Sequence, residues 1–545
     1  MVGALPQSDQ DIDSPSPTLS RRRRTWLLVV ASADVLLVLA SMVALNAALP
    51  DLAVETSATQ SQLTWIVDGY TLALACLLLP AGALGDRYGR RGALLVGLAI
   101  FTLASAAPIL FGSPTEIIIA RAFAGVGAAL IMPATLSLLT ASFPKSERNK
   151  AVGIWAGVAG AGAIFGFLGT GVLLHYFSWS SIFYGFAAAG LLMFALTLTI
   201  GSSRDEAATP IDWLGGVLIG FAIAIFVLGI VEAPVRGWSD PVVLGAMAGG
   251  VVLAAIFART QLRARHPLLD VRLFRSPDFS TGAAGITFLF FAMFGFFFIA
   301  MQFMQMVMGY TALQTAFALS PLAVPMLILS STIHLFLPKI GLRLATSLGL
   351  VLIAAGLFWM TYLTADATFV DLMWPMLVNA TGVGLCTAPT TAAIMSSAPD
   401  EKQGVASAVN DATREIGAAI GIAVAGSVLA AVYHDALAPK LDAFPGQVRD
   451  AATDSLAYAL SISEQMGPQG TQLAGLSVEA FLQAMDQALI VLSAAVLAGA
   501  VLIAFWGPGR NGLQWAFLCR AAVTDQPEPD DRGSEAAAGS GRHRK

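Results

Sequence analysis

Charged residues are scarce in this sequence. Asp, Glu, Lys and Arg make up 12% of its 545 residues, while 56% are hydrophobic. Because a water-soluble domain carries about 25% charged residues, this composition excludes a soluble globular enzyme. It predicts a polytopic membrane protein, in which the positions of the few charges matter more than the net charge of −5.

Cysteine and histidine are also rare, with three and five residues. Cys76, Cys386 and Cys519 are scattered, so the sequence predicts neither a disulfide framework nor a metal site. The phosphate-binding pattern G-x-x-x-x-G-K-[ST] and the nucleophile pattern G-x-S-x-G are both missing. We therefore expect no cofactor, no metal, no ATP-driven step and no enzymatic activity. The basic residues lie next to the ends of the apolar runs, which membrane topology explains, so we expect no nucleic acid as a partner.

Long apolar runs dominate the remaining sequence. A membrane-spanning helix needs about 20 apolar residues, and about fourteen runs meet this rule. The predicted spans are 25–49, 62–84, 92–112, 115–140, 150–175, 180–201, 212–233, 241–259, 279–307, 312–337, 343–363, 369–396, 403–433 and 479–507. The sequence thus predicts an all-α protein that crosses the membrane fourteen times.

The basic residues alternate between loops as this topology requires. Loops expected outside hold only Arg236, Lys440 and Arg449. Loops expected inside hold Arg87, Arg90, Arg91, Lys145, Arg148, Lys150, Arg204, Arg259, Arg263, Arg265, Arg272, Arg275, Lys339 and Lys402. Because one miscounted span would invert every later loop, the alternation supports the count. We expect a multi-pass protein of the cytoplasmic (inner) membrane, with both termini in the cytoplasm.

A weak internal repeat divides the chain into two halves. Gly125 and Gly127 precede Pro133, much as Gly382 and Gly384 precede Pro389. Two related six-helix halves are typical of secondary transporters. The predicted parts are a disordered cytoplasmic tail (1–24), an N-terminal half (25–201), two extra central spans (202–260), a cytoplasmic loop (261–278), a C-terminal half (279–507) with an external loop (434–478), and a second cytoplasmic tail (508–545).

The stretch Gly82-Ala-Leu-Gly-Asp86-Arg87-Tyr-Gly89-Arg90-Arg91 forms a tight charged turn between two apolar runs. Its spacing resembles the loop between spans 2 and 3 of the major facilitator superfamily. The 6+2+6 plan resembles the fourteen-span drug:proton antiporter branch, which includes exporters of quaternary ammonium compounds. Further similar stretches are Leu45-Asn46-Ala-Ala-Leu-Pro50, Trp65-Ile-Val-Asp68-Gly-Tyr70 and Pro267-Leu-Leu-Asp270-Val-Arg-Leu-Phe274.

This resemblance implies a function. It implies proton-coupled export of amphipathic, cationic compounds by alternating access, with the loop from Gly82 to Arg91 as a conformational switch. The expected partners are a small-molecule substrate, protons and the lipid bilayer. Two alternatives stay open: an exporter of a lipid or cell-envelope metabolite, and a membrane sensor or scaffold that transports nothing.

Three ionisable residues in the first spans are candidates for proton coupling. A charge at the middle of a bilayer costs roughly 2.5–3.5 kcal/mol, so each one calls for a reason. Asp68 can bind a proton or a cation, but not both; the alternative is an ordinary carboxylate at the water interface. Arg121 matches the span-4 signature of the family and is expected to act on a neighbouring acid.

Asp34 occupies a position where the chain departs from the family. The resembling family has an acid where this chain has Ser41. Asp34 lies two helical turns nearer the cytoplasm and is expected to share a face with Ser41. It either takes over part of the role of the missing acid or forms a structural pair with Arg121 or another helix.

The later spans supply candidates for substrate binding. Asp411, Arg414 and Glu415 are spaced to share one side of a helix; either the acids bind a cationic substrate, or the arginine merely neutralises them. Eight phenylalanines crowd 288–303; two or three of them, among which we select Phe294, are expected to line a cavity and most to face lipid. Gln302 and Gln305 are the polar candidates beside them.

Span 5 is rich in glycine, which permits close helix packing. Gly162, Gly166 and Gly171 occupy the place of the family's antiporter signature. Phe167 stands where that signature has proline. The departure weakens the implication that export proceeds by antiport.

Overall fold

The computed structural model describes residues 20–508, except 46, 47, 57, 59, 202–209, 443, 455 and 465. Nearly all of both predicted tails, together with Asn46, Arg204 and Cys519, lies outside the described residues. Over the described chain, fourteen helical segments are long and apolar enough to cross a membrane. The predicted number of spans is therefore confirmed.

The first six spans follow the predicted order, with one additional short helix. The elements are α1 (Arg21–Ala44), α2 (Leu49–Thr56), α3 (Gln60–Tyr88), α4 (Arg90–Leu110), α5 (Pro114–Ser142), α6 (Lys145–Tyr176) and α7 (Ser180–Thr197). The helix α1 already begins at Arg21, because the side chain of Ser20 caps it by accepting a hydrogen bond from the Arg23 amide. The last four residues of the predicted tail, 21–24, therefore belong to this helix.

The rest of the chain contains the extra spans and the second half. The elements are α8 (Trp213–Arg236), α9 (Pro241–Gln261), η2 (Val271–Arg275), α10 (Pro277–Gln302), η3 (Phe303–Val307), α11 (Ala312–Leu319), η4 (Ser320–Leu322), α12 (Ala323–Thr332), η5 (Ile333–Leu335), α13 (Leu337–Trp359), η6 (Met360–Tyr362), α14 (Phe369–Ser397), η7 (Asp400–Lys402), α15 (Gln403–Leu437), η8 (Ala438–Lys440), α16 (Gly446–Asp454), α17 (Leu456–Ser463) and α18 (Pro468–Trp506).

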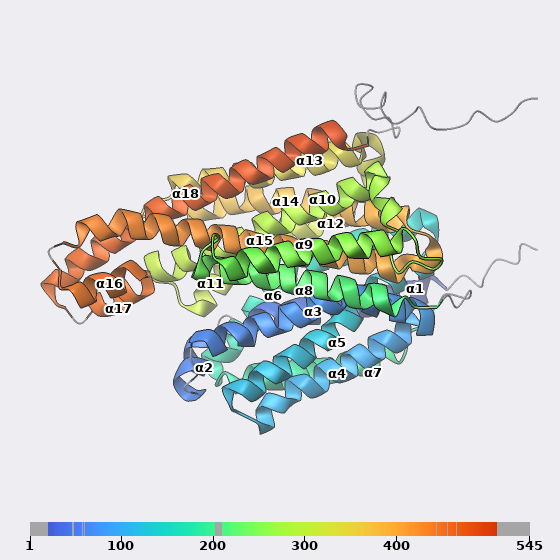
Figure 1. Ribbon diagram of the computed structural model, residues 1–545, viewed down its shortest axis with the longest axis horizontal. Coiled ribbons are helices and arrows are strands. Elements are labelled where there is room, and N and C mark those ends of the chain that lie inside the picture. The colour runs from blue at the N-terminus through green and yellow to red at the C-terminus, as the bar shows by residue number, and fades with distance from the viewer. Residues whose placement is uncertain are drawn as a thin grey trace, which may run out of the picture.

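The two halves lie side by side in Figure 1, with α1–α7 on one side and α10–α18 on the other. They contact each other mainly through α3 with α15, α5 with α15, and α6 with α12 and α14. The extra helices α8 and α9 pack on each other, and α8 also packs on both α3 and α15. This hairpin therefore covers one side of the boundary between the halves.

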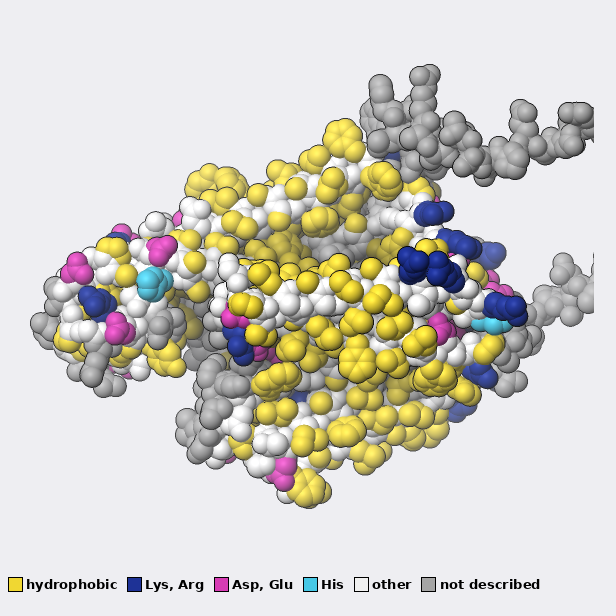
Figure 2. All heavy atoms as spheres, viewed as in Figure 1, with side chains coloured by type: hydrophobic (Ala, Val, Ile, Leu, Met, Phe, Trp, Pro, Cys, Tyr) yellow, Lys and Arg dark blue, Asp and Glu magenta, His cyan; other side chains and the backbone are white. Residues whose placement is uncertain are grey.

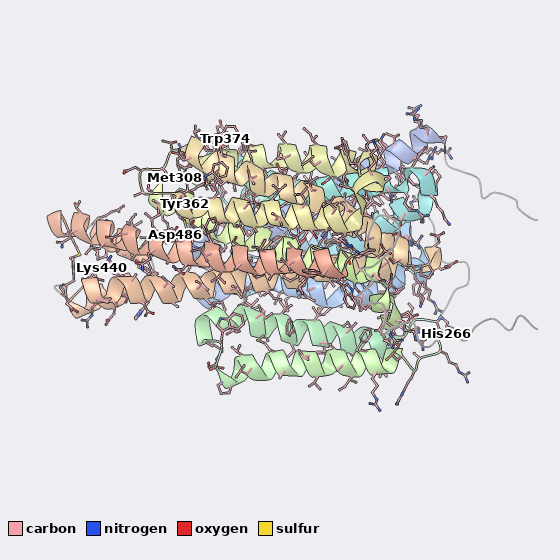
Figure 3. All side chains as sticks on the ribbon, turned by 90° about the horizontal axis from the view of Figure 1, so that it is seen from above. His266, Met308, Tyr362, Trp374, Lys440 and Asp486 are labelled. Atoms are coloured by element: carbon pink, nitrogen blue, oxygen red, sulfur yellow. The ribbon has the colours of Figure 1, made fainter. Side chains whose placement is uncertain are left out.

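Charge and apolar surface are separated along the helix axes. Figure 2 shows apolar side chains over the flanks of the bundle, with most of the charged side chains towards its two ends. In Figure 3 His266, after α9, lies at one end, whereas Lys440, after α15, lies at the tip of a projection from the other end. An apolar flank between polar ends is what a bilayer requires.

The predicted external loop 434–478 is helical over most of its described residues. The helices α15 and α18 continue beyond the predicted spans, and α16 and α17 pack between their ends. The hydroxyl of Tyr433 donates to the Ala452 carbonyl at 3.0 Å, and Lys440 lies 3.1 Å from the carboxylate of Glu479. These contacts join α15 to α16, and η8 at the end of α15 to α18, within the projection.

Candidate functional site

The acid of the charged turn joins the two halves at one end of the bundle. Both carboxylate oxygens of Asp86, in α3, accept from the Gly404 amide at 2.9 Å, and one accepts from the Val405 amide at 3.2 Å. These amides are at the N-terminus of α15, where unpaired N–H groups and the helix dipole favour an anion. Arg90 contacts the same carboxylate at 2.8 Å.

Close backbone packing brings this acid to its partner helix. A Cβ atom placed on Gly82 would lie 2.4 Å from the carbonyl oxygen of Gly404. Gly89, with φ 111°, makes the turn into α4. Arg91 binds the end of α7 through the carbonyls of Thr197 and Leu198.

Arg148 adds a second contact between the halves at this end. Its guanidinium lies 3.0 Å from the carboxylate of Asp400, just before α15. Arg90 donates to the Asp400 carbonyl at 3.2 Å. Arg87 contacts the ring of Tyr88, with its guanidinium carbon 5.5 Å from the ring centre. These ends of the two halves are thus held together in this conformation.

Arg121 is buried among neutral groups of the N-terminal half. Its guanidinium donates to the hydroxyl and carbonyl of Ser41 at 3.0 and 3.2 Å, and to the Ile66 carbonyl at 3.1 Å. It also lies over the ring of Tyr70, with 4.3 Å between its central carbon and the ring centre. The serine at the position of the missing acid therefore binds this arginine directly.

Asp34 has a different partner. Its side chain is fully buried, and one carboxylate oxygen accepts from the hydroxyl of Thr197, in α7, at 3.4 Å. The other oxygen has no hydrogen-bond partner among the described residues. Because two helical turns, about 11 Å along the axis, separate Asp34 from Ser41, the structure does not bring Asp34 together with Arg121.

Asp68 lies near the N-terminal end of α3, beside the extra helices. It is half-buried, and its electrostatic neighbour is Glu232, near the end of α8. Two acids close to each other favour binding of a positive charge between them. The sequence had not indicated this partner, because it belongs to the two spans outside the repeat.

The three ionisable residues of α15 lie together, as their spacing predicts, and face the other half. Arg414 and Asp411 are 1% and 0% exposed, with their nearest polar atoms 3.9 Å apart. The guanidinium carbon of Arg414 lies 5.1 Å from the ring centres of both Trp155, in α6, and Phe290, in α10. Its three nitrogens have no hydrogen-bond partner among the described residues.

Glu415 extends this cluster towards α3. It interacts electrostatically with Asp411 and Arg414 on its own helix, and with Tyr70 across the boundary. Tyr70 in turn carries Arg121 on its ring. Tyr70 is therefore an electrostatic neighbour of both Glu415 in the C-terminal half and Arg121 in the N-terminal half.

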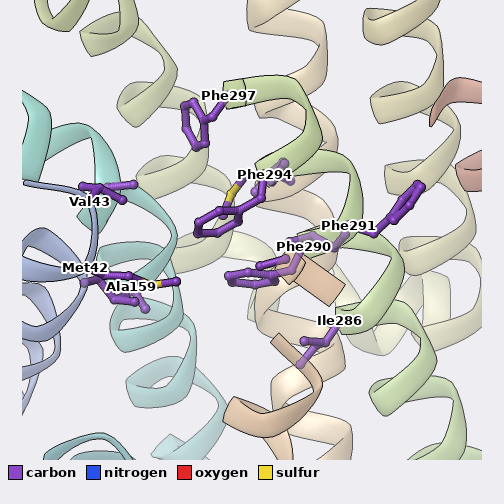
Figure 4. Close-up of a cluster of buried hydrophobic side chains, with 14 of the residues drawn as sticks. Met42, Val43, Ala159, Ile286, Phe290, Phe291, Phe294 and Phe297 are labelled. Atoms are coloured by element: carbon purple, nitrogen blue, oxygen red, sulfur yellow. The ribbon is translucent and has the colours of Figure 1, made fainter. Parts of the chain in front are cut away.

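Phenylalanines of α10 form the apolar wall of the cluster. Phe294 stacks on Phe290, with 6.1 Å between ring centres and 23° between planes. Figure 4 shows Phe290, Phe294 and Phe297 pointing towards the side where α1 and α6 lie. The expectation that most of the eight face lipid is wrong, because six are buried: Phe290, Phe291, Phe294, Phe296, Phe297 and Phe303.

The two glutamines lie apart from this cluster. Gln302 donates to the Phe298 carbonyl of its own helix at 3.1 Å. Gln305 is exposed in η3, beyond the end of α10. The structure therefore does not place either side chain with Asp411, Arg414 and Glu415.

The glycines of α6 serve two interfaces. Cβ atoms on Gly162 and Gly166 would lie 2.8 Å from Leu39 and 2.7 Å from Ala40, both in α1. One on Gly171 would lie 3.2 Å from Leu313, in α11 of the other half. The ring of Phe167 lies 6.4 Å from that of Phe297, so this replacement of proline also takes part in the contact between halves.

Two aromatic residues were missed from the sequence. Trp155 is fully buried and donates from its indole nitrogen to the hydroxyl of Thr135 at 3.2 Å, which fixes the ring under Arg414. The hydroxyl of Tyr70 donates to the Val38 carbonyl at 2.9 Å. For Trp155, the sequence signal that could have indicated a role is its position as a lone tryptophan within a glycine-rich span. Among the described residues no group of His, Cys, Asp and Glu could hold a metal ion.

Comparison with known proteins places this arrangement in a family. The model of the Major Facilitator Superfamily matches residues 35–422. The multidrug resistance protein Stp of Mycobacterium tuberculosis is 32% identical over 77% of this chain and 79% of that protein. The methyl viologen resistance protein SmvA of Salmonella typhimurium is 30% identical over 86% of this chain and 95% of that protein.

A solved structure shows the same fold at low sequence identity. The human organic anion transporter MFSD10 is 12% identical and aligns with a TM-score of 0.58 over 88% of this chain and 99% of that chain. These findings confirm the resemblance and agree with the expectation that the protein is not an enzyme. The chain belongs to the Major Facilitator Superfamily.

Proposed function

We propose that this protein exports amphipathic organic cations from the cytoplasm in exchange for protons. The observation that carries the proposal is the buried set Asp411, Arg414 and Glu415, which faces Trp155 where the two halves meet. Relatives named for multidrug resistance and methyl viologen resistance support drug export. Methyl viologen is an organic dication, which supports a cationic cargo.

The charge of the cluster favours exchange. With both acids ionised, Asp411, Arg414 and Glu415 carry one net negative charge. In a low-dielectric interior such a charge is costly, so the site gains a proton or a cation. Once one of them is bound, the charge is neutralised and the other has no electrostatic reason to bind. Competition of this kind couples the proton to the cargo.

The aromatic walls suit the apolar part of the cargo. The rings of Phe290 and Phe294 can contact a planar cation through their faces. Trp155 now holds Arg414 on its ring, so an incoming cation competes with the guanidinium for the same surface. In our proposal, cargo binding therefore displaces Arg414 and weakens one contact between the halves.

Other candidates have supporting roles in the proposal. Asp68, with Glu232 beside it, receives protons or releases cations at the outer end. Arg121 acts on Glu415 through Tyr70. Asp34, next to Thr197, is the more inward proton carrier. The contacts of Asp86 with α15 hold the cytoplasmic ends shut while the outer side is accessible.

We place the protein in the cytoplasmic membrane with both ends of the chain inside. The basic first turn of α1 supports this orientation, because Arg24 binds Glu147 at the start of α6, close in sequence to Arg148 with its cytoplasmic contact. Basic residues remain on the cytoplasmic side during insertion.

The test is a proton-flux assay in proteoliposomes that contain a pH-sensitive dye. Organic monocations, dications and neutral drugs are added separately under an imposed pH gradient. The proposal expects the two kinds of cation to drive proton movement and Glu415→Gln to abolish it. Equal responses to neutral drugs and cations, or none to any of them, would overturn the proposal. Glu479→Gln, in the external projection, is the matched control.

A further inference from the structure

An apolar groove of about 510 Å³ lies between the extra helices and the second half. Its walls come from α8 and α9 on one side and from α15 on the other, and Leu79 of α3 also lines it. Its volume is within the range of about 300–1,000 Å³ of small-molecule sites. Nearly all lining residues are apolar; the hydroxyl of the polar one, Thr413, donates to the Asn410 carbonyl of its own helix.

The groove and the transport cluster occupy opposite faces of α15. Val409, Ala412, Thr413 and Ile416 line the groove, and at about 100° per residue they lie on the side away from Arg414. The groove therefore offers its occupant no charged group from the transport cluster. Its chemistry fits a hydrocarbon chain.

The cytoplasmic end of the groove is built by a basic segment. Leu269, Val271 and Phe274 from the connection between α9 and α10 line it. The same connection is tied down by the amide side chain of Gln261, which donates to Asp212 at 2.6 Å and accepts from the Leu269 amide at 3.3 Å. Lys402 also donates to the Pro267 carbonyl of this segment at 2.7 Å.

Five arginines lie in the last turn of α9 and in the segment that follows it. They are Arg259, Arg263, Arg265, Arg272 and Arg275, and all five are exposed. Figure 2 shows basic side chains gathered at the end of the bundle where α9 stops. Within the described part of the chain none of the five has an ion-pair partner. Exposed positive charge beside an apolar groove at the inner membrane surface fits an anionic lipid.

We propose that this groove binds an anionic phospholipid of the inner leaflet. One acyl chain lies between α8, α9 and α15, and the phosphate group contacts the five arginines. Bound lipid then fills the space between the extra helices and α15, on the face opposite the transport cluster. The proposal concerns a site in the two extra spans and stands whether or not the protein exchanges protons for cations.

The test uses the purified full-length protein and native mass spectrometry. The protein is stripped of lipid and titrated with phosphatidylglycerol or with phosphatidylcholine of the same acyl chains. We expect one phosphatidylglycerol to bind about tenfold tighter than phosphatidylcholine. Replacement of the five arginines by Gln should remove that preference. Ala254→Phe, which fills the groove, should weaken both lipids.

Matched controls separate the site from general attraction to basic surface. Lys145→Gln with Lys150→Gln removes exposed charge at the same membrane face, away from the groove lining. Ala255→Phe adds the same bulk to an exposed neighbour of Ala254 that does not line the groove. Both controls should bind phosphatidylglycerol as the wild type does.

Three outcomes would overturn the proposal. Equal affinity for the two lipids would remove the role of the arginines. Unchanged binding by Ala254→Phe would show that the acyl chain lies elsewhere. If the lysine control loses as much phosphatidylglycerol affinity as the arginine replacement, the preference reflects general surface charge and not this site. Melting temperatures of all variants, measured in the same detergent, identify any variant that has lost its fold, and Ala254→Val then replaces Ala254→Phe.

Discussion

The guanidinium of Arg414 in α15 lies over the indole ring of Trp155 in α6, with 5.1 Å between its central carbon and the ring centre. The contact joins the two halves at a buried point, beside two carboxylic acids of the same helix as the arginine. A contact between halves must break during each cycle of alternating access. A contact that cargo can replace is therefore suited to start that step.

Removal of this ring should slow transport. Trp155→Ala is expected to reduce the efflux rate about tenfold or more, because in our proposal the ring also binds the cargo cation, and a desolvated cation–π contact contributes about 2 kcal/mol. Trp155→Phe retains a ring and should lose less. Fluorescence of an effluxed organic cation in energised cells gives the rate. Trp374→Ala, at an exposed tryptophan of α14 labelled in Figure 3, should leave it unchanged; equal rates for Trp155→Ala and wild type would contradict this role.

Neutralisation of Asp68 should stop export of cations. Asp68→Asn keeps the size of the side chain but cannot alternate between a charged and a neutral form, so it should abolish cation efflux while the protein stays in the membrane. Efflux from inverted vesicles and immunoblots of the membrane fraction measure the two properties. Asp366→Asn, an exposed acid in a loop, is the control. Unchanged proton-dependent efflux by Asp68→Asn would remove this residue from the mechanism.

The contact of Asp86 with α15 should set the conformational equilibrium. Asp86→Asn removes the charge that Arg90 and the Gly404 amide bind, so these ends of the two halves should separate. Spin labels are attached to cysteines introduced at Ser146 and Glu401, with the native cysteines replaced. The distance between the two labels is measured by electron paramagnetic resonance. Glu147→Gln breaks an ion pair with Arg24 inside one half and should not change it. Identical distance distributions for Asp86→Asn and wild type would refute the prediction.

The glycines of α6 should differ sharply in their tolerance of a methyl group. Gly166→Ala places a Cβ atom 2.7 Å from the backbone of Ala40, and such overpacking costs about 1–3 kcal/mol. A Cβ on Gly169, three residues later, meets no atom within 4 Å, so Gly169→Ala should be neutral or stabilising, since alanine favours a helix. Thermal unfolding in detergent measures both variants. A melting temperature for Gly166→Ala equal to that of Gly169→Ala would show that α1 and α6 are not tightly packed.

Spans and the charged turn could be predicted from the sequence, because both depend on local composition. A run of about 20 apolar residues has few alternatives to a transmembrane helix. Helix rotation and contacts between distant spans could not be predicted in the same way. Asp34 and Ser41 share a helix face, yet they have partners on different helices. Thr197 of α7 donates to Asp34, and Arg121 of α5 donates to Ser41.

Other details have equally specific causes. The predicted span 312–337 is confirmed as the candidate span Ala312–Leu335, but its helix is divided into short pieces around Pro321, which lacks a backbone donor. The phenylalanines of α10 are buried because α10 packs against α14, α15 and α18, so few positions on it are left for lipid. The sequence of the predicted span 279–307 could not show this burial, because apolar side chains suit lipid and a protein interior equally well.

In our proposal, one carboxyl cluster binds a proton and a cation in turn. Binding of an organic cation to the purified protein, in weakly buffered detergent solution, should release protons that a pH dye detects, and its affinity should fall as the pH falls. Glu415→Gln together with Asp68→Asn should bind the cation more weakly and release no protons. A wild type that binds the cation with no proton release, and with the same affinity at every pH, would contradict the proposed exchange.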